Sequence, residues 1–462
     1  MKQLLRLQLI ICLLLLNKSA FSQQIIWEKG FEHSPGADVF LPLTKINDTT
    51  VIAGGSTSRY RSFYVKYHIN GQEVWNRTGR QFITGEQDIC PFTNGYFYTG
   101  AVPNRAVNQG SSVMLQRLNM QGDTIWTKVY AGFLNDEAYR MQVAGDNIYI
   151  TGVGINRNRI TYTLHKTDTL GVLIWRKFYY PITWFGSSYP CDLLVRPSGN
   201  LIISGISQAA NQYFRLHLLE VNTNGDSLRS ATISLRNVAA NEMHYRAYNN
   251  FSLTSDGKYI ASGTIDSAGH QLGYVVKIDT SLSLIWSTII RPTAPQKRMQ
   301  TSKVKELPNG NFALLATDNS QLTNNIHVYT ISPAGKLQNR TSFSSTYCSN
   351  LRILDWVLLN DGGSIVSGRC FSRDETYIAR IRVLPTGIAE SVSINDLNLG
   401  DAYPNPTQDE ITIPYSLPRK FRTATLLINE VVTGHQIKTY DLKSNKFQER
   451  INISLNDFSV VV

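Results

Sequence analysis

The stretch Thr124–Lys128 reads TIWTK, and its pattern of an aliphatic residue followed by tryptophan returns at Leu173–Lys177 and Ile285–Ser287. Between successive copies lies a burst of apolar residues that ends in glycine, as in Ile148–Gly152 and Leu201–Gly205. A fixed period of this kind is typical of repeat architectures, in which each unit is one supersecondary motif packed against its neighbours. This repeat decides the fold class.

Seven units can be counted along the chain. Their bursts end at Gly55, Gly100, Gly152, Gly205, Gly263, Thr317 (in the place of glycine) and Gly368. Each burst follows a tight-turn sequence such as Asn94-Gly95 or Asp361-Gly362, and these pairs favour the positive φ of two-residue hairpins. The segments between turns are rich in Val, Ile, Tyr and Phe, which indicates strands. Each unit therefore predicts four antiparallel strands, a to d in chain order.

The tryptophan position marks the d strand of each unit. It is occupied by Trp75, Trp126, Trp175, Arg229, Trp286 and Asn339. The seventh unit has no match after Gly387, whereas Ile25–Lys29 (IIWEK) at the other end of the chain fits the pattern. We expect this N-terminal strand to complete the last blade, because ring closure hides sheet edges. The prediction is an all-β protein with a seven-bladed β-propeller over residues 23–390.

Residues 1–22 are typical of a secretory signal peptide. Lys2 and Arg6 supply the charged start, Leu7–Leu16 an apolar run, and Ala20–Ser22 a small-residue cleavage site. The apolar run is too short to span a bilayer, and no later stretch is long and apolar enough. We therefore expect an exported chain without a transmembrane segment.

Charge and cysteine content narrow the class of partner. Removing Lys2, Arg6 and Lys18 with the signal lowers the net charge from +11 to +8, with no dense Lys/Arg run. This charge is not a nucleic-acid signature; it is compatible with an acidic glycan as partner, and an ordinary solvated surface explains it better. Four cysteines remain, without the spacing of zinc ligands. Cys348 and Cys370 fall in one repeat and can form a disulfide in an oxidising compartment, while Cys90 and Cys191 are expected to be buried thiols.

No motif for catalysis or for a cofactor occurs. The chain lacks HExxH, GxSxG, a phosphate-binding loop and an EF-hand loop. The histidines are scattered, and we interpret the shared c-strand register of His217 and His327 as packing. We expect no catalytic residues, no metal and no cofactor.

Loops, by contrast, offer a place for binding. In an antiparallel blade the a–b and c–d turns lie at one end, the turn face, and the b–c and d–a loops at the other, the loop face. The loop-face segments are long and varied, as binding segments on rigid scaffolds are. The candidate ligand-binding residues are Arg59, Arg61, Arg105, Arg157, Arg159, Tyr180, Trp184, Tyr189 and Arg298. Arginine and aromatic side chains together suit sugar rings that carry carboxylates or sulfates. The alternative is that the aromatics cap the channel and the arginines are solvated.

The C-terminal tail differs from the repeats. After a linker at 391–400 come Ala402–Thr407 (AYPNPT), Ile411–Ile413 and Ala424–Ile428. Residues 401–462 resemble the type A C-terminal sorting domain of the Bacteroidetes type IX secretion system. The resemblance implies a small Ig-like β-sandwich and export through the periplasm by the type IX machinery, followed by release or attachment to the cell surface. It also implies a sorting motif, formed by Tyr403, Pro404, Asn405, Pro406 and Thr407. Members of this family continue through a further strand after the equivalent of Leu455–Asp457, so we expect a truncated last strand here.

The sequence thus favours a secreted or cell-surface propeller that binds a glycan or a surface protein without catalysis. Two alternatives stay open: a propeller-scaffold enzyme of the polysaccharide lyase or quinoprotein type, and a structural surface protein. An enzyme predicts carboxylate, Tyr or His side chains with perturbed pKa values near the channel. A binding module predicts an arginine and aromatic surface.

Overall fold

The computed structural model describes most of the repeat region and five strands of the tail. The described residues are 25–31, 39–56, 61–82, 84–103, 110–130, 135–156, 159–180, 187–208, 214–235, 242–243, 250–267, 270–292, 299–318, 325–382, 398–399, 410–416, 423–429, 436–443 and 449–454. The chain divides into two compact units, residues 23–385 and residues 1–22 with 386–462. The predicted signal peptide lies outside the described residues.

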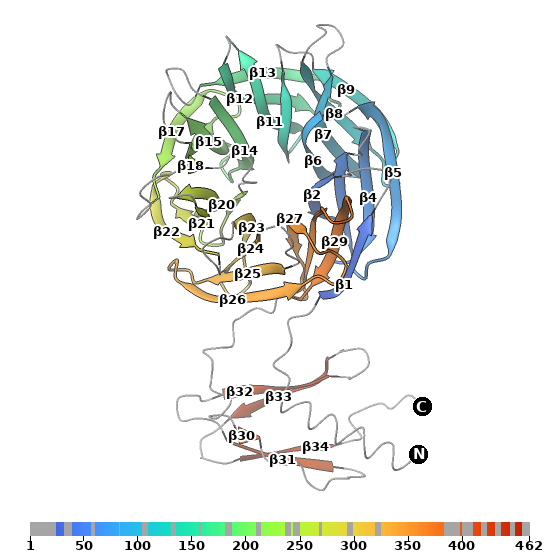
Figure 1. Cartoon of the computed structure of the whole chain (residues 1–462), viewed down its shortest axis with the longest axis vertical. Coiled ribbons are helices and arrows are strands. Elements are labelled where there is room, and N and C mark those ends of the chain that lie inside the picture. The colour runs from blue at the N-terminus through green and yellow to red at the C-terminus, as the bar shows by residue number, and fades with distance from the viewer. Residues whose placement is uncertain are drawn as a thin grey trace. The chain divides into compact units, whose positions relative to one another are not determined.

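The larger unit is a seven-bladed β-propeller, as predicted. Figure 1 shows seven sheets around a common centre, each with its strands following one another outward. Blade 1 is β2 (Val39–Lys45), β3 (Thr50–Ser56), β4 (Arg61–His68) and β5 (Glu73–Phe82). Blade 2 is β6 (Thr84–Phe92), β7 (Gly95–Pro103), β8 (Ser111–Leu118) and β9 (Thr124–Tyr130). Blade 3 is β10 (Glu137–Ala144), β11 (Asn147–Asn156), β12 (Arg159–Asp168) and β13 (Leu173–Tyr179). Blade 4 is β14 (Ser187–Val195), β15 (Leu201–Gln208), β16 (Arg215–Val221) and β17 (Ser227–Ile233).

The remaining blades repeat this order with two variations. Blade 5 is β18 (Glu242–Met243), β19 (Asn250–Leu253), β20 (Tyr259–Ser267), β21 (His270–Ile278) and β22 (Leu284–Ile290). Its first strand is thus in two pieces, both paired with β20. Blade 6 is β23 (Met299–Glu306), β24 (Phe312–Asp318), β25 (Asn325–Ile331) and β26 (Leu337–Ser344). Blade 7 is β27 (Leu351–Leu358), β28 (Ser364–Cys370), β29 (Glu375–Ile381) and, from the other end of the chain, β1 (Ile25–Phe31).

The ring closes through β1, which pairs antiparallel with β29 and places Trp27 opposite Arg380. The predicted closure by the N-terminal strand is therefore confirmed. Glu28 ties this strand to the loop between blades 6 and 7: its carboxylate accepts hydrogen bonds from the backbone N–H of Thr346 at 2.8 Å and of Tyr347 at 3.1 Å. Burial alone would raise the pKa of Glu28, but hydrogen bonds led by those of Ser345 and Thr346 outweigh burial and lower it. The Glu28 carboxylate is therefore ionised and holds the N-terminal strand to residues 345–347; we call this contact the Glu28 clasp.

Hydrophobic contacts hold neighbouring blades together. The buried apolar residues form seven clusters, and each cluster spans one blade interface. The closing interface, for example, packs Leu43 and Val51 of blade 1 against Val357 and Ile365 of blade 7. Because apolar burial is the dominant favourable term in folding, these clusters make the ring one cooperative body.

The repeated tryptophan packs on a glycine of the next blade. Gly71, in the c–d turn of blade 1, has φ +91°, and a Cβ there would lie 2.9 Å from the Trp27 ring. The indole N–H of Trp27 also donates to the carbonyl of Ile69 at 2.8 Å. Glycine is required here by both the positive φ and the close approach of the ring. The same arrangement joins Trp75 to Gly122, Trp126 to Gly171, Trp175 to Gly225 and Trp286 to Gly335.

Both exceptions to the tryptophan pattern have a structural reason. Arg229 replaces the indole in blade 4, and its guanidinium reaches the carbonyl of Thr280 at 2.6 Å, the equivalent acceptor in blade 5. The glycine of that turn is replaced by Leu282, which has φ 69° and is buried. Asn339 in blade 6 faces blade 7, whose c and d strands come from opposite ends of the chain, so no continuous c–d turn is there to receive a ring.

One alignment made from the sequence is wrong. We expected Thr317 to replace the glycine of the b strand in blade 6, but Ala316 holds that position. Ala316 pairs with His327 as Gly205 pairs with His217, so the two histidines do share a register. At this position the b strand faces a bulge of the a strand. A Cβ on Gly152 would lie 1.7 Å from the carbonyl oxygen of Glu137, which explains why small residues are needed.

The tail unit contains two small antiparallel sheets. One joins β30 (Asn398–Leu399), β31 (Glu410–Ser416) and β34 (Glu449–Ser454) in that order, and the other pairs β32 (Thr423–Asn429) with β33 (Gln436–Lys443). The predicted linker lies mostly, and the predicted sorting motif Tyr403–Thr407 entirely, outside the described residues.

Candidate functional site

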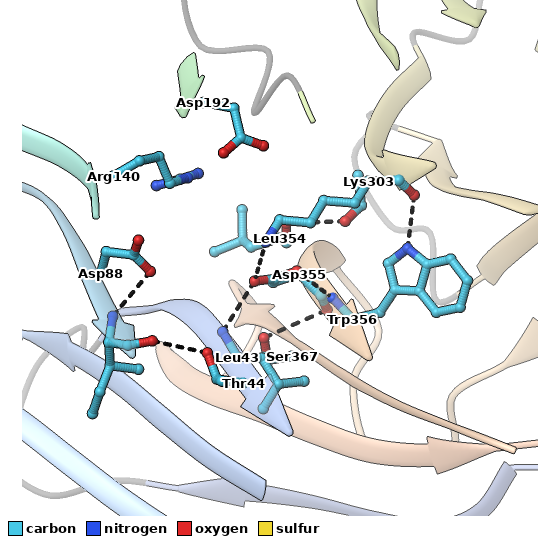
Figure 2. Close-up of polar contacts among 12 residues, drawn as sticks. Leu43, Thr44, Asp88, Arg140, Asp192, Lys303, Leu354, Asp355, Trp356 and Ser367 are labelled. Atoms are coloured by element: carbon cyan, nitrogen blue, oxygen red, sulfur yellow. Dashed lines mark hydrogen bonds and ion pairs between the residues drawn. The ribbon is translucent and has the colours of Figure 1, made fainter. Parts of the chain in front are cut away.

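Charged side chains gather where the innermost strands surround the centre of the ring. They occupy matching places on the a strands of blades 2, 3, 4, 6 and 7 and comprise Asp88, Arg140, Asp192, Lys303 and Asp355. Figure 2 shows these five side chains grouped around the centre, and we call them the channel ring. Each lies at the bulge of its strand, where the local irregularity turns the side chain toward the neighbouring blade.

The aspartates of the channel ring connect blades through backbone hydrogen bonds. Asp355 is 2% exposed, and one of its carboxylate oxygens accepts the N–H of Leu43 in blade 1 at 3.0 Å. Its other oxygen accepts the N–H of Trp356 at 2.7 Å. Asp88 makes the same bond to the N–H of Met141 at 2.8 Å, and Asp192 to that of Phe251 at 3.0 Å. Each of three blade interfaces is thus bridged by a hydrogen bond from a backbone N–H to an aspartate of the neighbouring blade, and we call this bond the aspartate staple.

The sixth and seventh blades add further polar contacts to this staple. Lys303 forms an ion pair with Asp355 at 2.9 Å, and its carbonyl accepts the indole N–H of Trp356 at 2.7 Å (Figure 2). The hydroxyl of Ser302 donates to the carbonyl of Leu354 at 3.0 Å. One oxygen of the Asp355 carboxylate therefore links blade 7 to blades 1 and 6, and the other is bound within its own strand.

Two groups near the channel have perturbed pKa values. Burial raises the pKa of Asp88 to about 6, although the neighbouring Arg140 opposes the shift. Burial, with the adjacent Lys303 cation, lowers the pKa of Lys305 to about 8. The Lys305 ammonium lies 5.8 Å from the centre of the Trp356 ring. These are the perturbed groups that an enzyme would predict, yet the Asp88 oxygens already accept the N–H groups of Ile89 and Met141.

The buried histidines lie between blades rather than in the channel. His165 is fully buried with its ring 6.2 Å from that of Tyr130, and His217 is 2% exposed with its ring 5.9 Å from that of Tyr162. Burial lowers the pKa of His165 to about 3, with Arg176 adding to the shift, and that of His217 to about 4. Both rings are therefore neutral in the folded protein over the physiological range.

These histidines predict a loss of stability in acid. An unfolded histidine titrates near pH 6.5, so below that pH the unfolded chain binds more protons and the folded state loses free energy. Asp88 acts in the opposite sense, because its raised pKa makes the folded chain take up a proton first as the pH falls. We expect His165→Leu to remove one acid-sensitive contribution of up to about 1.4 kcal/mol per pH unit below pH 6.5. Urea unfolding of wild type and variant at pH 7 and pH 5 measures this contribution. If the free energies of unfolding of the two proteins differed by the same amount at both pH values, the lowered pKa of His165 would be contradicted.

Four predicted ligand-binding residues are described, and all lie at loop-face ends of strands. Arg61 begins β4 and Arg159 begins β12, while Tyr180 follows β13 and is 41% exposed. Tyr189 in β14 is half-buried and packs on Phe214 with ring centres 5.9 Å apart. The other five, Arg59, Arg105, Arg157, Trp184 and Arg298, lie outside the described residues.

Blade 7 carries loop-face residues that the sequence analysis missed. The d–a loop Ser345–Asn350 and the b–c loop Phe371–Asp374 are joined by a Cys348–Cys370 disulfide, with Cα atoms 5.7 Å apart. We call these two segments the blade 7 loop pair. The N–H of Phe371 donates to the carbonyl of Asn350 at 2.8 Å, which adds a second link. The sequence Arg369–Asp374 has the arginine and aromatic content that we sought only in the first three b–c loops.

The other two cysteines are free thiols, Cys191 buried and Cys90 half-buried. Within the described ranges, no three His, Cys, Asp or Glu side chains converge as metal ligands. Nor does that part of the chain contain a helix with the length and apolar character needed to cross a membrane.

The fold defines the class as a seven-bladed β-propeller. No protein-family model matches the chain, and no curated protein sequence matches it. Solved structures are similar in fold at very low identity. The extracellular domains 1–2 of Drosophila Semaphorin 1a are 8% identical, cover 79% of this chain and 90% of their own, and have a TM-score of 0.52. A PL25 polysaccharide lyase, an ulvan lyase, is 11% identical, covers 76% of this chain and 95% of its own, and has a TM-score of 0.51. At these identities the likeness concerns the fold alone.

Proposed function

We propose that this propeller is a non-catalytic binding module, which takes a glycan or a surface protein on its loop face. The observation that carries the proposal is that the carboxylates of the channel ring are occupied by hydrogen bonds to backbone N–H groups. Asp88, Asp192 and Asp355 each give one oxygen to a backbone N–H of the next blade and the other to their own strand. Carboxylates bound in this way stabilise the scaffold, and recognition is left to the varied loops.

Side chains on the loop face support the view that the loops carry recognition and the a-strand carboxylates carry stability. Arg61, Arg159 and Tyr180 lie at loop-face strand ends of blades 1 and 3, and the blade 7 loop pair adds further arginine and aromatic groups. Arginine offers a planar fork for carboxylates and sulfates, and an exposed aromatic ring offers an apolar face. The set suits an acidic glycan better than a neutral one.

Thermal unfolding of the mature chain, residues 23–462, against neutral and acidic polysaccharides tests this function. A ligand at about 100 times its dissociation constant should stabilise the fold by about 2.7 kcal/mol. We expect a shift with an acidic polymer that shrinks in Arg61→Ala and Tyr180→Ala, and persists in Arg340→Ala on the outer strand β26. Unshifted melting with every polysaccharide would count against glycan binding.

The proposal also covers the cellular location of the protein, which rests on residues 1–22 and on residues 401–462. We propose that residues 1–22 direct the chain to the periplasm and that residues 401–462 are a type IX sorting domain, so that the propeller is secreted or held at the outer cell surface. The support is the Tyr403–Thr407 motif and the strands that follow it. Substituting Pro404 and Asn405 by alanine should retain the protein in the periplasm, as cell fractionation would show; unchanged export would contradict this.

One observation favours an enzyme as the second candidate. Asp88 and Lys305, with pKa values of about 6 and about 8, lie near the channel and could exchange protons near neutral pH. The propeller would then act on a polymer that enters the channel. Depolymerisation lost in Lys305→Met would support this alternative over simple binding.

A further inference from the structure

The blade 7 loop pair holds one arginine in a fixed position with a free edge. The Arg373 Nε donates to the carbonyl of Tyr347 at 2.9 Å, and its guanidinium carbon lies 4.4 Å from the centre of the Tyr347 ring. The Arg373 side chain also interacts with the Tyr347 hydroxyl. No carboxylate among the described residues forms an ion pair with Arg373, so its guanidinium keeps hydrogen-bonding capacity for a ligand. A stacked guanidinium loses less freedom on binding than a mobile one.

Tyr347, on which Arg373 stacks, is itself fixed from several sides. Its hydroxyl donates to the Glu375 carboxylate, its N–H donates to Glu28 at 3.1 Å, and its neighbour Cys348 is in the disulfide. The platform is thus anchored to β1, to β29 and to the opposite loop.

An exposed aromatic ring completes the surface. Phe371 is 41% exposed although its backbone is bonded to Asn350. The Arg369 guanidinium carbon lies 4.8 Å from the Phe371 ring centre, and Asp374 neutralises Arg369 at 2.7 Å. Within the described residues the loop pair therefore presents one arginine paired with a carboxylate, one arginine without such a pair and one apolar ring.

We propose that the blade 7 loop pair is a binding site for an acidic saccharide unit, with Arg373 on its carboxylate or sulfate and Phe371 against the C–H face of its ring. This inference rests on the proposed function and adds to it a subsite on blade 7. The free edge of a guanidinium matches two oxygens of such an anion in parallel hydrogen bonds. Phe371 is the one large apolar side chain exposed in the loop pair, whereas a stable protein interface buries about 800 Å² per partner.

The test compares affinities of the mature chain for polygalacturonate, chondroitin sulfate and neutral dextran. We expect Arg373→Ala to weaken binding to an acidic polymer at least about tenfold, the size of a lost charge-assisted contact. Arg373→Lys should lose most of the same affinity, because lysine offers neither the stacking nor the fork. Phe371→Ala should weaken binding while leaving its salt dependence unchanged. The carboxylate and sulfate polymers distinguish the two sources of anion.

Arg340→Ala is the matched control, since it removes the same charge from an exposed position on β26. Wild-type affinity in Arg373→Ala, or equal losses in both arginine variants, would overturn the inference while leaving the proposed function in place. Failure of the wild type to bind any acidic polymer would overturn the inference and the glycan form of the function together. Unchanged melting temperatures of the variants exclude a folding defect as the cause.

Discussion

Replacing Asp355 by alanine should lower the free energy of unfolding by about 3–5 kcal/mol, the cost of breaking a buried ion pair from one side. The carboxylate is 2% exposed and accepts hydrogen bonds from two backbone N–H groups, besides its ion pair with Lys303. Alanine would leave these donors and the ammonium without an acceptor in a site with little water. Unsatisfied buried donors are costly because they lose their hydration without a replacement.

Urea unfolding of the mature chain measures the Asp355 effect. Asp355→Asn keeps the shape and one acceptor, so we expect a loss between those of wild type and alanine. Asp226→Ala is the matched control, since this carboxylate is 60% exposed in its pair with Lys177, and its removal should leave the midpoint nearly unchanged. If Asp355→Ala and Asp226→Ala had the same midpoint, the aspartate staple would have no role in stability.

Deleting residues 23–31 should abolish the cooperative unfolding transition of the propeller. Blade 7 would lose its d strand, and blade 1 would lose the Trp27 indole from Gly71 and the Lys29 bond to the Gly71 carbonyl at 2.7 Å. The Glu28 clasp on Thr346 and Tyr347 would be lost as well. The open edge of β29 would be a template for pairing with other chains, so we expect aggregation.

A synthetic peptide of residues 23–31 supplies the control for this deletion. Added in excess, it should restore soluble protein with a native circular dichroism spectrum, because the peptide carries all the residues with which β1 contacts β29, blade 1 and the Thr346–Tyr347 segment. A scrambled peptide should have no effect. A deleted chain that stayed monomeric with the wild-type midpoint would show that the ring does not depend on N-terminal closure.

Much of this fold is predictable because the same four-strand unit is repeated in the sequence. The seven apolar bursts with their tight turns give the blade count, and the IIWEK match gives the closure. The contact of a tryptophan with a turn glycine of the next blade occurs at five of the seven interfaces. The alignment failed at Ala316, where the small-residue requirement of the b strand is met without glycine. It also missed the broken first strand of blade 5, since no periodic signal marks an interruption.

The candidate site is less predictable from sequence. Asp88, Asp192 and Asp355 are separated by 104 and 163 residues, so no constant period marks them. Their role depends on which backbone N–H of the next blade they face, and only the assembled ring brings those groups together. Arg373 and Tyr347 stack although 26 residues separate them. Their contact depends on the disulfide and on Glu28 from the other end of the chain, so no local pattern contains it.

The central claim is that the propeller binds a polymer without cleaving it. Calorimetric titration of the mature chain with polygalacturonate, followed by sizing of the recovered polymer, tests this claim most directly. We predict saturable binding that is weakened in Arg373→Ala, with the polymer length unchanged after prolonged incubation. A polymer shortened by the wild type but not by Lys305→Met would instead place an enzyme in the channel and contradict the account.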